Sequence, residues 1–115
     1  STKLQELQDR LICLTDLLGG NWNIDSGYPA WTYRESSRIR PIAADAFEEV
    51  FGVRPEITTI HAGLECGLLS GKKPELDCIS FGPNMRDVHS FNARLEIASA
   101  EKIWNVLKII LKRCK

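Results

Sequence analysis

A chain of 115 residues is one domain by size and is long enough to bury a core. Its fifteen lysines and arginines balance its fifteen aspartates and glutamates, so no net charge recruits nucleic acid or an anionic membrane surface. The longest apolar run is too short to cross a bilayer, and no signal peptide opens the sequence. These features predict a soluble, cytoplasmic protein that binds neither nucleic acid nor membrane.

The four cysteines, Cys13, Cys66, Cys78 and Cys114, are widely dispersed along the chain. They are too dispersed for a zinc-knuckle pattern, which needs pairs about two to four residues apart. Each cysteine lies in an apolar setting, as buried free thiols do in a reducing cytosol. We therefore expect free, buried cysteines rather than a disulfide framework.

Leucines recur at steps of three and four through the first eighteen residues, which predicts an amphipathic helix that ends at Gly19 and Gly20. The set is Leu4, Leu7, Leu11, Leu14 and Leu18. Residues 21–25 then alternate between polar and apolar side chains, the pattern of a half-buried strand. Residues 26–31 break this pattern and predict a hinge or domain boundary.

A second helix is expected from an N-cap at Ser36 or Ser37 to Phe51, with Pro41 in its first turn and Gly52 closing it. Residues 57–60 and 76–81 are β-branched or apolar runs that predict two strands. A short helix is expected between them, over residues 63–69.

The last helix is expected to start at Ser99, with an apolar stripe too wide for a helix that faces solvent. From residue 36 the predicted order is helix, strand, helix, strand, helix. This order indicates an α/β fold with a layered sheet, whose strands are parallel or mixed. The first 28 residues cannot close a core of their own and look like half of a domain.

Two polar segments, residues 61–67 and 81–90, follow the two predicted strands. In open α/β sheets, ligands bind at the carboxyl ends of strands, where loop amides and helix N-termini converge. His89 lies here between Asp87 and Ser90, where an imidazole can face a cleft. Taken alone, however, a loop histidine is more often a surface group than a metal ligand.

The first polar segment also has ordinary structural explanations. His61 can anchor the end of a strand, and Gly63 can serve a tight turn. Glu65 falls in the first turn of the predicted helix, where the helix dipole favours a carboxylate whatever its function. None of these residues is specific by itself.

Together the two segments resemble a known family. His61-Ala-Gly-Leu-Glu-Cys-Gly-Leu-Leu69, followed by Ile79-Ser-Phe-Gly-Pro83 and His89-Ser90, is similar to the C-terminal part of bacterial aminoacyl-histidine dipeptidases. These are carnosinase-like members of the di-zinc exopeptidase family. Gly27-Tyr-Pro-Ala-Trp31 looks like the point where that family's chain leaves its lid domain. The resemblance implies that residues 1–28 end a lid or dimerisation domain and that residues 29–115 form the C-terminal part of a catalytic α/β domain.

The resemblance also implies roles for individual residues. His89 matches a ligand of one of two bridged metal ions, and the turn containing Gly63 and Glu65 matches one beside the substrate. Relatives carry a glutamate where this chain has Ala93, a difference that puts loop support and full activity in doubt. Nothing in the sequence corresponds to the family's general base or to most of its metal ligands, so the resemblance implies a fragment.

The implied activity is hydrolysis of Xaa-His and other small dipeptides by water that two zinc ions activate, with cobalt or manganese as alternative metals. Because a catalytic zinc needs about three protein ligands, we expect this chain alone to bind no metal and to be inactive. Its expected partners are the missing N-terminal half, a dipeptide substrate and a second copy bound through the lid segment.

Two alternatives stay open. One is a non-catalytic dimerisation or binding module derived from this fold. The other is a small hydrolase with Cys66 as its nucleophile and His61 five residues away, although burial in an apolar helix would raise the pKa of that thiol.

Overall fold

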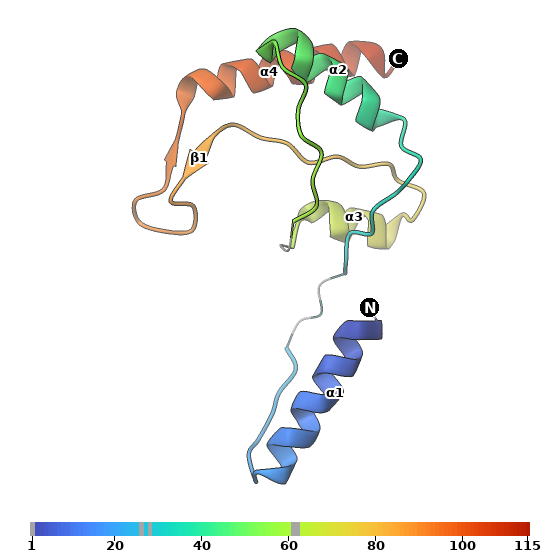
Figure 1. Ribbon diagram of the computed structural model, residues 1–115, viewed down its shortest axis with the longest axis vertical. Coiled ribbons are helices and arrows are strands. Elements are labelled where there is room, and N and C mark those ends of the chain that lie inside the picture. The colour runs from blue at the N-terminus through green and yellow to red at the C-terminus, as the bar shows by residue number, and fades with distance from the viewer. Residues whose placement is uncertain (1, 26, 28, 61–62) are drawn as a thin grey trace. The chain divides into compact units, whose positions relative to one another are not determined.

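The computed structural model describes residues 2–25, 27, 29–60 and 63–115 (Figure 1). In chain order its elements are α1 (Thr2–Leu17), α2 (Ile39–Phe51), α3 (Glu65–Lys72), β1 (Met85–Arg86), β2 (Arg94–Leu95) and α4 (Ile97–Arg113). The chain divides into two compact units. The first contains residues 1–32 and 62–74, and the second contains residues 33–61 and 75–115.

The predicted layered α/β sheet is wrong. The described residues are mostly helical, and their one sheet is an antiparallel pair of two-residue strands that joins Met85 to Leu95 and Arg86 to Arg94. Residues 21–25, 57–60 and 76–81 form no strand. A β-branched or alternating run becomes a strand only when a neighbouring strand satisfies its backbone groups. Among the described residues only β1 and β2 pair as strands, so none of these three runs has the neighbour that it needs.

The first predicted helix is confirmed as α1. Gly19 lies just beyond it with a φ of 69°, the left-handed conformation that glycine adopts without strain. The Gly20 amide donates to the Thr15 carbonyl at 2.9 Å and satisfies one of the last helical acceptors. The five predicted leucines are all more than half exposed, so this stripe has no apolar partner among the described residues.

The second predicted helix is also confirmed, although α2 begins two residues after Ser37. The Ser37 hydroxyl oxygen accepts the Arg40 amide at 3.1 Å. A carboxylate oxygen of Asp77 accepts the amides of Arg38 at 2.7 Å and Ile39 at 3.1 Å. An aspartate distant in sequence therefore caps this helix, a contact that no local pattern predicts.

These contacts set the charge state of Asp77. Its partial burial would raise the pKa of the carboxyl group, but the hydrogen bonds that it accepts outweigh this effect and the pKa of Asp77 is lowered. The donors are the Ile39 amide, the Ser37 hydroxyl and the Arg38 amide, and the charge of Arg34 adds to them.

The core of the second unit lies between α2 and α4, which pack against each other (Figure 1). Ala43 and Ala46 of α2 meet Val106 and Ile110 of α4, and all four are buried. The small alanines let the two helix backbones approach closely. Phe81, the last residue of the segment predicted as a strand, packs its ring edge-on against Phe47, with centroids 5.4 Å apart. Residues 76–81 therefore contribute to the core without forming a strand.

The four cysteines are free thiols, but two of them differ from the prediction. Cys66 and Cys78 are half-buried, whereas Cys13 and Cys114 are exposed. Cys13 is exposed because α1 has no covering partner in the described structure.

Candidate functional site

The hairpin that carries His89 is tied to the start of α4. At its base, the Asn84 amide donates to the buried Ser99 hydroxyl at 2.9 Å, and that hydroxyl donates to the Glu96 carbonyl at 2.7 Å. The Glu96 amide returns a bond to the Asn84 carbonyl at 3.0 Å. The Asn84 side-chain amide also donates to the Glu96 carboxylate at 3.0 Å. Ser99 is only 4% exposed, so the hairpin is anchored on the packed part of the unit.

The tip of the hairpin, residues 87–93, closes through its own hydrogen bonds. The Ser90 hydroxyl donates to the Asp87 carbonyl at 2.6 Å and accepts the Asn92 amide at 3.1 Å. Arg94 donates from Nη2 to the Asp87 carboxylate at 2.7 Å. The side chains of this ion pair are 71% and 48% exposed, so solvent screening limits the pair to at most about 1 kcal/mol.

The backbone of the tip is unusual at two positions. Asp87 has a φ of 52° and His89 a φ of 63°, and no other described residue except glycine has a positive φ. This conformation costs an L-residue roughly 1–2 kcal/mol, although aspartate and histidine tolerate it better than most side chains. Residues with such a backbone conformation are retained where surrounding hydrogen bonds hold the backbone in place, and they concentrate at functional sites.

His89 itself is exposed on this loop. The described residues contain no group of three or more histidine, cysteine, aspartate or glutamate side chains that could hold a metal ion. A catalytic zinc takes about three protein ligands. The part of the chain that the structure describes therefore does not fit a complete zinc site.

Gly63 and Glu65 lie at the start of α3, in the first unit, whereas His89 belongs to the second. Both are exposed, and Glu65 is the first residue of the helix, where its charge favours the dipole. The helix ends at Lys72, three residues later than predicted. His61 lies outside the described residues, so the distance between His61 and Cys66 that the hydrolase alternative requires is not defined by the structure.

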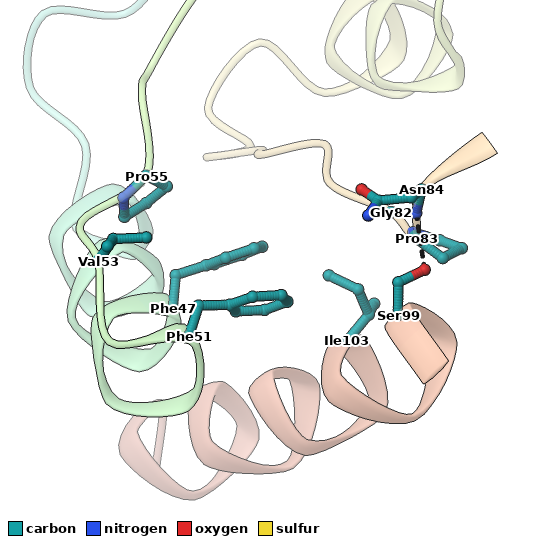
Figure 2. A pocket seen from close by; sticks show the side chains of 9 residues that line it. All are labelled: Phe47, Phe51, Val53, Pro55, Gly82, Pro83, Asn84, Ser99 and Ile103. Atoms are coloured by element: carbon teal, nitrogen blue, oxygen red, sulfur yellow. Dashed lines mark hydrogen bonds between the residues drawn. The ribbon is translucent and has the colours of Figure 1, made fainter. Parts of the chain in front are cut away.

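An apolar pocket of about 180 Å³ lies beside the base of the hairpin (Figure 2). Its lining residues are Phe47, Phe51, Val53, Pro55, Gly82, Pro83, Asn84, Ser99 and Ile103. Its two polar side chains, Asn84 and Ser99, both take part in the bonds at the hairpin base, and Figure 2 shows the Asn84 backbone bonded to the Ser99 hydroxyl. No charged side chain lines the pocket, so it offers no acid or base for catalysis.

Sequence reasoning missed the roles of the residues that hold the loop, which are Asp87, Ser90, Arg94 and Ser99. A signal was present for two of them, because Asp87 and Arg94 have opposite charges and flank the loop at the distance of a short hairpin. The role of Ser99 depends on the tertiary contact with Asn84, and the sequence carried no sign of it.

No helix in the part of the chain that the structure describes combines the length and apolar character needed to cross a membrane.

No protein-family model matches this chain. Over 99 residues, or 86% of its length, it is 33% identical to the cytosol non-specific dipeptidase of Escherichia coli strain K12. The match covers 20% of that enzyme, so the chain spans about a fifth of the length of the curated relative. The predicted similarity to a dipeptidase is thereby confirmed, at a distant level and over most of this chain.

Proposed function

We propose that this chain is a segment of a metal-dependent dipeptidase and that His89 is one of the ligands of its metal centre. The proposal is supported by the 33% identity to a dipeptidase and by the ordered loop that presents His89. Its substrates are Xaa-His and other small dipeptides. In this assignment, residues 1–28 end a lid domain and residues 29–115 belong to the catalytic domain.

Because the described residues do not fit a zinc site, other ligands and the general base come from outside them. Zinc, or cobalt or manganese in its place, would supply Lewis-acid chemistry when bound in the whole enzyme, and His89 is the residue of this chain that would help to hold it. The chain contributes the His89 imidazole, and we propose that Gly63 and Glu65, at the start of α3, contact the substrate in the whole enzyme. We propose that the chain alone hydrolyses nothing, and that its location is cytosolic, as the relative's name indicates for that enzyme.

The test is a chimera in which this chain replaces the matching segment of the E. coli dipeptidase. We expect the folded chimera to hydrolyse dipeptides, and His89→Ala to lower both its zinc affinity and its turnover. The isolated 115-residue chain is the companion sample and should show neither tight zinc binding nor turnover. A folded chimera whose zinc affinity is the same with and without His89 would refute the proposal, as would turnover by the isolated chain.

A second candidate function is a non-catalytic dimerisation or binding module. The observation that favours it is the leucine stripe of α1, whose members are each more than half exposed. Sedimentation of the isolated chain separates the two candidates. A tight dimer that Leu11→Glu dissociates, together with an inactive chimera, would favour the module over the dipeptidase segment.

A further inference from the structure

We draw no further inference here: the strongest candidate, the apolar pocket that α2, α4 and the base of the hairpin line in the second unit, carries none because nothing in the structure shows what covers it.

Discussion

Asp77 caps α2 from a segment that lies 38 residues further along the chain than Ile39, and its removal should destabilise the second unit. Its carboxylate accepts the Arg38 and Ile39 amides at 2.7 and 3.1 Å. Loss of a helix cap costs about 0.5–2 kcal/mol, and charged acceptors lie toward the upper end. Because Asp77 is half-buried, water replaces only part of the lost bonding. We expect Asp77→Ala to lower the free energy of unfolding by about 2 kcal/mol, and Asp77→Asn by about half as much.

The effect should depend on pH in a defined direction. The hydrogen bonds lower the pKa of Asp77 below its ordinary value of 3.8 in the folded chain. Its contribution to stability is therefore fully present above the unfolded pKa and is lost as the pH falls through the lower, folded pKa. The difference between the unchanged chain and Asp77→Asn should be constant near neutral pH and should shrink below about pH 4.

Urea unfolding, followed by helical circular dichroism between pH 3 and 7, measures both effects. Glu101→Gln removes an exposed carboxylate from α4 and is the control for loss of charge alone. Asp77→Ala unfolding at the same urea concentration as the unchanged chain would refute the capping argument. A difference that grows as the pH falls would refute the sign of the pKa shift.

Three further pairs of variants test the core, the end of α2 and the hairpin. Ile110→Ala should cost about 2–4 kcal/mol in urea unfolding because Ile110 is buried, whereas Leu111→Ala, one residue later and 59% exposed, should change stability by less than about 0.5 kcal/mol. Gly52→Ala should lower the free energy of unfolding by about 1 kcal/mol, because its φ is 75° and nothing lies within 4 Å of the new methyl group. Gly82 has similar space but no positive φ, so Gly82→Ala is the control, and equal effects of the two substitutions would contradict this reasoning. His89→Gly should keep or increase hydrogen-exchange protection of the Ala93 amide, whereas the β-branched His89→Val should reduce it, and the reverse order would rule out the left-handed backbone.

The helices could be predicted largely from the sequence because their signals are local. The leucine repeat followed by Gly19 defined α1, and Gly52 marked the end of α2 correctly. A helix satisfies its backbone within one segment, so spacing and end residues are enough to locate it. Helix α4 begins at Ile97, two residues before the predicted start at Ser99. Ser99 lies buried within the first turn of the helix and does not precede it.

The strands could not be predicted in the same way. Residues 57–60 and 76–81 have strand-like composition, but a strand needs a second segment to accept its hydrogen bonds. None of the described residues supplies one, and Phe81, the last residue of the second run, packs on Phe47 instead. The two-residue pairing of β1 with β2 was not predicted, because the segments are too short to show a period.

The sequence by itself indicated the similarity to dipeptidases and made His89 and its loop a candidate site, because these depend on residue identity and order. Only the tertiary structure revealed that Asp87, Ser90 and Arg94 close that loop and that Ser99 anchors it on α4. The physical reason is that hydrogen bonds and ion pairs depend on distances of about 3 Å between atoms. The folding of the chain sets those distances, and the spacing of residues along the sequence does not.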